Sequence, residues 1–126
     1  MRPTSLLRWA VTICYAAGIF YLSSRPWSGL PAFPYLDKVV HLGLYGGLGS
    51  LCAWSLSASM PLPRRTLFLI ALGIAVLYGL SDEVHQMYVP GRSAEMGDLA
   101  ADALGGALGA FLALVLVRRP AAPPGA

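Results

Sequence analysis

The sequence predicts an all-α, polytopic membrane protein that folds as a compact bundle of four transmembrane helices. Of its 126 residues, 56% are hydrophobic and only 12% are charged, and the mean hydropathy is +0.62. This composition is too apolar for a soluble domain of such size. Four runs lack any Asp, Glu, Lys, Arg or His: Trp9–Ser24, Leu42–Ser57, Thr66–Leu80 and Ala103–Val117. We expect one four-helix domain over residues 1–119, followed by a disordered Pro/Ala/Gly tail at 120–126.

The first apolar run follows Arg2 and Arg8, an arrangement shared with secretory signals. No small-residue cleavage site follows the run, so we expect a retained first span. A proline-rich connection comes next, and its aromatic residues Trp27 and Tyr35 suit a membrane interface.

The second helix is expected to open with Asp37, whose carboxylate can cap or stabilise the positive end of a helix. Asp37, His41 and Tyr45 recur at intervals of four residues. Residues at this spacing share one helical face, so they predict a polar stripe.

The third and fourth runs are too short to cross a bilayer alone. Fifteen residues of helix reach about 22 Å, whereas a bilayer core needs roughly 20 residues and about 30 Å. The third helix should therefore continue into the polar stretch Ser81–Arg92, in which Tyr78, Asp82 and His85 share a face. By the same argument, Asp102 lies at membrane depth on the fourth helix, where Glu95, Asp98 and Asp102 form a stripe.

The distribution of Lys and Arg predicts the orientation. One set of ends and loops carries Arg2, Arg8, Arg64, Arg65, Arg118 and Arg119, and the other carries Arg25, Lys38 and Arg92. The positive-inside rule then puts both termini in the cytoplasm. The net charge of +3 reflects this topology and indicates no nucleic-acid partner.

The three polar segments converge at the helix ends away from the cytoplasm. Charged groups at membrane depth cost about 2.5–3.5 kcal/mol each, so they should face one another or a water-filled cleft. We therefore predict one shared, outward-facing site. Its candidate residues are Asp37, Lys38, His41, Tyr45, Asp82, Glu83, His85, Gln86, Arg92, Asp98 and Asp102. The alternative is a structural network of salt bridges and hydrogen bonds that holds the helices together.

Metal binding is a weaker alternative for the same residues. His41 and His85 with Asp37, Glu83 or Asp98 offer suitable ligands, but no HExxH or paired-Cys spacing is present. We assign no metal and no cofactor from the sequence.

Small residues predict close helix packing. Gly43 and Gly47 on the second helix, and Ala101, Gly105 and Gly109 on the fourth, follow the small-xxx-small spacing. This spacing favours packing within the bundle, with a homo-oligomer through Gly105 and Gly109 as the alternative.

Three segments together resemble the VanZ-like membrane proteins: Asp37–Tyr45, Ser81–Gln86 with Val89–Arg92, and Asp98–Gly105. The resemblance covers roughly residues 36–112. It implies a bacterial cytoplasmic-membrane protein of the cell envelope, and the family's named member gives low-level teicoplanin resistance. Asp102 stands where the family commonly has Asn, which adds a negative charge to the site.

Three functions remain open at this stage. The first is a binding or transport protein for a lipid-linked, cell-wall or glycopeptide-related ligand. Arg92 and Lys38 would hold an anion of that ligand, and membrane lipids would surround the protein. The second is a membrane hydrolase or transferase in which Glu83 or Asp82 is the base, His85 or His41 is the acid, and Arg92 stabilises negative charge. The third is a proton or cation path through the buried acids, which would require an oligomer.

Overall fold

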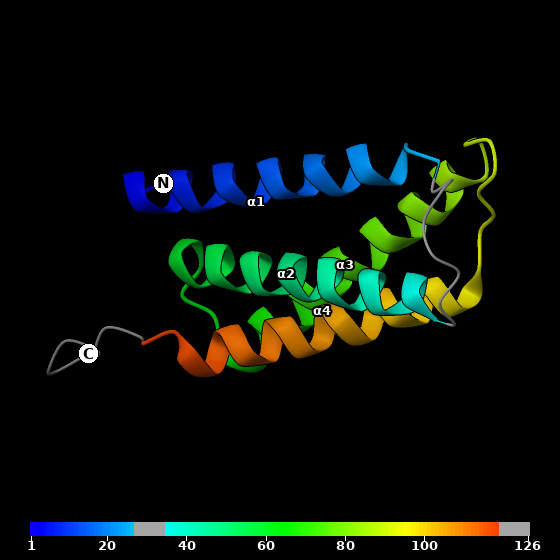
Figure 1. Cartoon of the computed structure of the whole chain (residues 1–126). Coiled ribbons are helices and arrows are strands. Elements are labelled where there is room, and N and C mark those ends of the chain that lie inside the picture. Colours follow the sequence, from blue (N-terminus) through cyan, green and yellow to red (C-terminus); the bar gives the residue numbers. More distant parts are fainter. Residues whose placement is uncertain (27–34, 119–126) are drawn as a thin grey trace, which may run out of the picture.

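The computed structural model describes residues 1–26 and 35–118, which form four helices (Figure 1). They are α1 (Pro3–Ser23), α2 (Leu36–Ser59), α3 (Arg64–Gln86) and α4 (Met96–Leu116). No strand occurs within these two ranges. All four helices are long and apolar enough to cross a membrane, which confirms the predicted all-α fold. The predicted tail at 120–126 and Trp27 of the first connection lie outside the described residues.

The helices extend beyond the apolar runs at their polar ends. α3 continues through Asp82 and Glu83 to Gln86, as the length argument predicted. Asp37 lies in the first turn of α2, but it does not cap the helix. The cap position belongs to Tyr35, which has a left-handed φ of 62° and no capping side-chain hydrogen bond.

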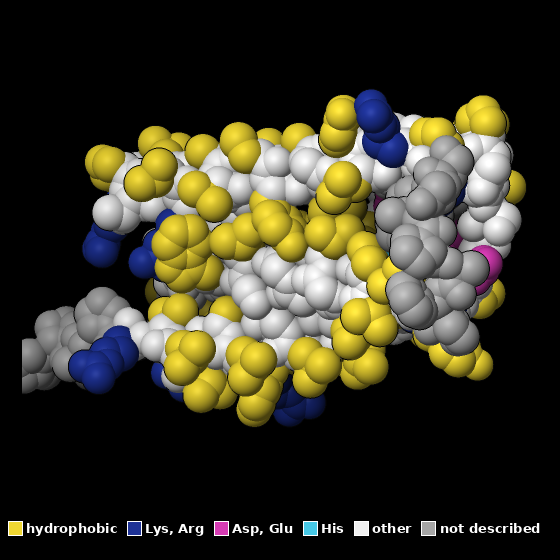
Figure 2. Space-filling view, viewed as in Figure 1, with side chains coloured by type: hydrophobic (Ala, Val, Ile, Leu, Met, Phe, Trp, Pro, Cys, Tyr) yellow, Lys and Arg dark blue, Asp and Glu magenta, His cyan; other side chains and the backbone are white. Residues whose placement is uncertain are grey.

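Successive helices alternate in direction, so α2 and α4 run parallel to each other (Figure 1). The start of α1 and the end of α4 lie at one end of the bundle, and the polar segments lie at the other. On the face shown in Figure 2, hydrophobic side chains lie along the helices, and the visible acidic atoms lie near the polar end. An apolar exterior of this kind suits contact with lipid.

α2 and α4 make the closest helix pair, and glycines permit it. A Cβ added at Gly105 would overlap the carbonyl oxygen of Leu42, and one at Gly109 would overlap that of Gly46. The Gly105/Gly109 face therefore packs against α2 inside the bundle and is not available for contact with a second copy of the chain. The two glycines predicted to pack together on α2 have different surroundings. Gly47 faces Tyr15 of α1, whereas a Cβ added at Gly43 would meet nothing within 4 Å.

Polar contacts attach α1 to the other helices. Thr12 Oγ1 lies 2.8 Å from Ser55 Oγ, and the Tyr15 hydroxyl donates to the Leu44 carbonyl at 2.8 Å. Tyr78 of α3 donates to the Ala16 carbonyl at 2.6 Å. Such hydrogen bonds hold helices together in lipid, where no hydrophobic effect drives one helix onto another.

Candidate functional site

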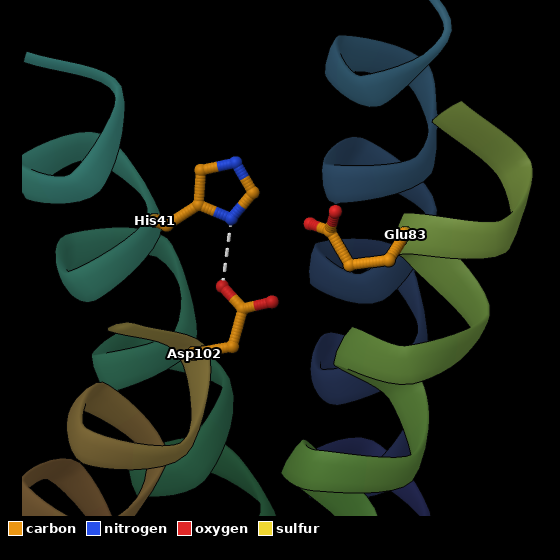
Figure 3. A group of neighbouring side chains, drawn as sticks. All are labelled: His41, Glu83 and Asp102. Carbon is orange, nitrogen blue, oxygen red and sulfur yellow. Dashed lines mark hydrogen bonds and ion pairs between the residues drawn. The ribbon is translucent and has the colours of Figure 1, made fainter. Parts of the chain in front are cut away.

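A buried polar group joins three helices at one end of the bundle. His41 of α2, Glu83 of α3 and Asp102 of α4 point toward one another (Figure 3), and each offers a ligand atom within 4.8 Å of the other two. His41 Nδ1 lies 2.7 Å from Asp102 Oδ1. The exposed fractions are only 4%, 5% and 0% for His41, Glu83 and Asp102. We call this set the inner triad.

The parallel pairing of α2 and α4 explains how two of the polar stripes meet. Lys38 and His41 are three residues apart on α2, and Asp98 and Asp102 are four apart on α4, so each pair spans about one turn. Lys38 faces Asp98 and His41 faces Asp102, as two successive rungs between the helices. His41 Nε2 also lies 3.7 Å from Asp98 Oδ2, which links the two rungs.

Lys38 is surrounded by carboxylates. Its ammonium donates to Asp37 Oδ2 at 2.7 Å, to Asp98 Oδ1 at 2.7 Å and to Glu95 Oε2. An ammonium has three N–H donors, and all three are used here. Lys38 therefore supplies the cation of a second acidic group made by Asp37, Glu95 and Asp98.

Three more candidates are buried close to the same helix ends. Gln86 Nε2 donates to Asp82 Oδ2 at 3.3 Å, and the ring of Tyr45 stacks beside that of His41 with centroids 6.3 Å apart. Several oxygens of this region have no hydrogen-bond partner among the residues the structure describes. They are Tyr45 Oη, Glu83 Oε1, Gln86 Oε1 and Asp102 Oδ2.

His85 and Arg92 contact other neighbours. His85 Nε2 lies 2.8 Å from Ser24 Oγ, and its ring stacks on Phe20 with centroids 4.5 Å apart. Glu83 and His85 are two positions apart on α3, which separates them by about 200° around the helix. Arg92 donates to the carbonyl of Arg25 at 3.2 Å. The structure thus brings most of the candidates together, with His85 and Arg92 directed toward the α1 side.

Glu83 also fixes the start of α4. Its Oε2 accepts the backbone N–H of Glu95 at 2.9 Å, and Glu95 is the residue that precedes α4. A carboxylate at this position satisfies one of the free N–H groups of a helix start and interacts favourably with its dipole. Asp102 is accommodated by a glycine of α3, because a Cβ on Gly79 would lie 2.8 Å from Asp102 Oδ2.

An apolar pocket lies beside the inner triad, between the ends of α3 and α4. It has a volume of about 220 Å³ and is lined by Leu80, Glu83, Val84, Met87, Ala94, Glu95, Met96 and Leu99. The candidate list from sequence contained Glu83 alone of these residues. Glu95 was placed in the polar stripe of the fourth helix but was not among the candidate site residues. The apolar lining residues could not be identified from sequence, because exposed Leu, Val and Met are common on lipid-facing surfaces.

These features define a class: a multi-pass membrane protein with a buried, ionisable cluster at one end of a four-helix bundle. Ionisable side chains inside a membrane bundle usually have a functional role. The chain belongs to the VanZ/LLP1 family, whose pattern it matches over residues 6–117. No curated protein and no solved structure matches it.

Proposed function

We propose that this chain is a cell-envelope protein that binds a lipid-linked or cell-wall ligand at the polar end of its bundle. The observation that supports this function is the position of Glu83, which belongs to the buried inner triad and also lines the apolar pocket. A ligand with an apolar chain next to a polar group fits that combination.

The pocket suits one segment of a hydrocarbon chain. Pockets for whole drug-sized ligands measure roughly 300–1,000 Å³, so a volume of about 220 Å³ is too small for a complete molecule. Its rim residues Val84 and Met96 are 49% and 79% exposed, on a surface that the bilayer would cover. Membrane lipids and lipid-linked molecules would reach the pocket from the side.

The polar groups around the pocket favour a ligand that donates hydrogen bonds. The Glu95 side chain at the edge of the pocket is 50% exposed, and its carboxylate accepts hydrogen bonds when ionised. Lys38 has all three donors engaged, so we do not assign it an anion. Hydroxyl or amine groups of a saccharide or peptide stem complement this surface better than a bare phosphate does.

The enzyme alternative with Glu83, His85 and Arg92 gains less support from the geometry. Glu83 and His85 face different neighbours, so they do not form an acid–base pair around one substrate position.

A pocket-filling substitution tests the proposal. Val84→Trp should weaken binding of a lipid-linked saccharide-peptide in nanodiscs at least about tenfold, because the indole occupies the volume of the chain segment. Leu77→Trp is the matched control, since Leu77 lies two turns earlier on the same face of α3, is 68% exposed and does not line the pocket. Two results would overturn the proposal. One is equal binding by both variants. The other is that protein stripped of metal ions binds bare polyprenyl phosphate more tightly than the saccharide-peptide lipid.

The proposal extends to localisation and phenotype. We place the chain in the bacterial cytoplasmic membrane with both termini in the cytoplasm, so that the pocket faces the outer leaflet where cell-wall intermediates are used. If binding there protects the cell, expression in a susceptible bacterium should raise the inhibitory concentration of teicoplanin. Val84→Trp should abolish that increase and Leu77→Trp should keep it.

A further inference from the structure

We propose that the inner triad of His41, Glu83 and Asp102 binds a divalent transition-metal ion, Zn²⁺ or Mn²⁺. From the sequence, metal binding was only a weaker alternative that combined His41 and His85 with Asp37, Glu83 or Asp98 and did not include Asp102, because these residues lie far apart in the chain and follow no metal-binding spacing. Their convergence from three different helices appears only in the fold (Figure 3).

The first argument is the direction of the ligand atoms. One nitrogen of His41 and one oxygen each of Glu83 and Asp102 lie within 4.8 Å of one another, and all three side chains are more than nine-tenths buried. An ion bound by three protein ligands keeps one position open, as catalytic zinc sites do. The neighbouring apolar pocket shares Glu83, so this open position would lie close to a bound ligand.

The second argument is the unused oxygens that face this group. Glu83 Oε1 and Asp102 Oδ2 are buried without a hydrogen-bond partner anywhere in residues 1–26 and 35–118. Buried polar atoms are normally satisfied, and an unpaired carboxylate oxygen in a membrane bundle is a strong exception. A cation between the two carboxylates would satisfy both.

The third argument is charge. One divalent ion balances the two carboxylates of Glu83 and Asp102 when both are ionised. The second acidic group differs in this respect, because the Lys38 ammonium already lies among Asp37, Glu95 and Asp98. We therefore assign an ion to the inner triad and none to the group around Lys38.

The ligand types select the metal. One imidazole and two carboxylates suit Zn²⁺ or Mn²⁺, whereas Mg²⁺ and Ca²⁺ prefer oxygen ligands alone. Neither cysteine belongs to the triad: Cys14 is exposed on α1, and Cys52 is buried in the core of α2. Asp98 Oδ2 lies 3.7 Å from the ring nitrogen of His41 that does not face Asp102, which is beyond hydrogen-bonding distance.

The test measures metal binding without any lipid ligand, so its result is separate from that of the proposed function. Chelator-treated protein in detergent should bind one Zn²⁺ or Mn²⁺ per chain, with a Kd of about 1 µM or tighter. X-ray absorption of the Zn²⁺ form should show only nitrogen and oxygen ligands, including one imidazole. Absence of stoichiometric binding of either ion, or a sulfur ligand, would overturn the proposal.

Isosteric variants locate the ion. Glu83→Gln and Asp102→Asn should each weaken binding at least about tenfold, since the loss of an outer-shell partner alone costs about 10–100-fold. His85→Asn is the matched control, because His85 lies at the same end of the bundle but contacts Ser24 and Phe20. The ion would lie elsewhere if Glu83→Gln and Asp102→Asn bind the metal with wild-type affinity. The same conclusion would follow if His85→Asn loses as much metal affinity as those two variants do. The absorption measurement on unmodified protein decides the matter if a variant fails to fold.

Discussion

Lys38 is the residue that joins the two polar helix starts, because a single ammonium contacts acids of both α2 and α4. Its side chain is 26% exposed, whereas that of Asp98 is only 6% exposed. The contact with Asp98 is therefore the strongly desolvated one, and Asp37 and Glu95 remain partly solvated. Most of the energetic effect of Lys38 should come through Asp98.

Removal of the Lys38 charge should destabilise the bundle. Removing one partner of a fully buried ion pair lowers the free energy of unfolding by roughly 3–5 kcal/mol, whereas an exposed ion pair contributes only about 0–1 kcal/mol. For this half-buried case we expect Lys38→Met to lower the free energy of unfolding by about 2 kcal/mol. Lys38→Arg keeps the charge and should lose less. Denaturation in mixed micelles measures both, and equal stability of Lys38→Met and wild type would show that the pair contributes nothing.

At the residue scale, the sequence predicted the polar faces better than the partners. A spacing of four residues, between Asp37 and His41 and between Asp98 and Asp102, identified side chains that share a helical face. Their pairing depends on the parallel register of α2 and α4, which no spacing within one helix contains. Asp102 shows the same limit, because its carboxylate lies 2.7 Å from His41 Nδ1, a contact between residues 61 positions apart in the sequence.

At the scale of the elements, glycines decide how closely α2 and α4 approach. Gly46 and Gly49 of α2 meet Gly105, Gly106 and Gly109 of α4, with backbone against backbone. The rungs of polar residues continue this same interface toward the helix starts. Close packing and polar pairing therefore depend on one register.

Adding a methyl group to this interface should disturb it. We expect Gly109→Ala to destabilise the protein by about 1–3 kcal/mol, because its Cβ would overlap the Gly46 carbonyl and overpacking costs that much. Gly43→Ala is the control: its Cβ would meet nothing within 4 Å, and Ala is the better helix former by about 1 kcal/mol. Comparison of the two melting temperatures measures the difference. Similar destabilisation by both substitutions would contradict the interface assignment.

The four helices themselves were predictable because a bilayer imposes a minimum length. Apolar runs of 15–16 residues became helices of 21–24 residues, and the length argument placed Asp82, Glu83 and Asp102 on helices. Helix starts were less predictable. Glu95 was expected on the fourth helix but precedes it, since its N–H is bound by Glu83, a contact that only the folded bundle provides.

At the scale of the whole molecule, acidic residues are confined to one end of the bundle. All six of them, Asp37, Asp82, Glu83, Glu95, Asp98 and Asp102, and both histidines lie there. The same end has only three cations, Arg25, Lys38 and Arg92. The opposite end of the described chain carries Arg2, Arg8, Arg64, Arg65 and Arg118 and no acid. The excess of Lys and Arg at the opposite end predicts a definite orientation in the membrane.

Cysteine labelling tests this orientation. Ser93 lies in the exposed connection between α3 and α4 at the acidic end, and Pro61 lies in the exposed connection between α2 and α3 at the basic end. Because Lys and Arg favour the cytoplasmic side, a membrane-impermeant maleimide should label Ser93→Cys in intact cells and Pro61→Cys only after permeabilisation. The wild type is the background control: Cys14 lies on the apolar surface of α1, which lipid would cover, and Cys52 is buried in the core, so the reagent should reach neither. Labelling of Pro61→Cys, and not of Ser93→Cys, in intact cells would reverse the topology and turn the inner triad toward the cytoplasm.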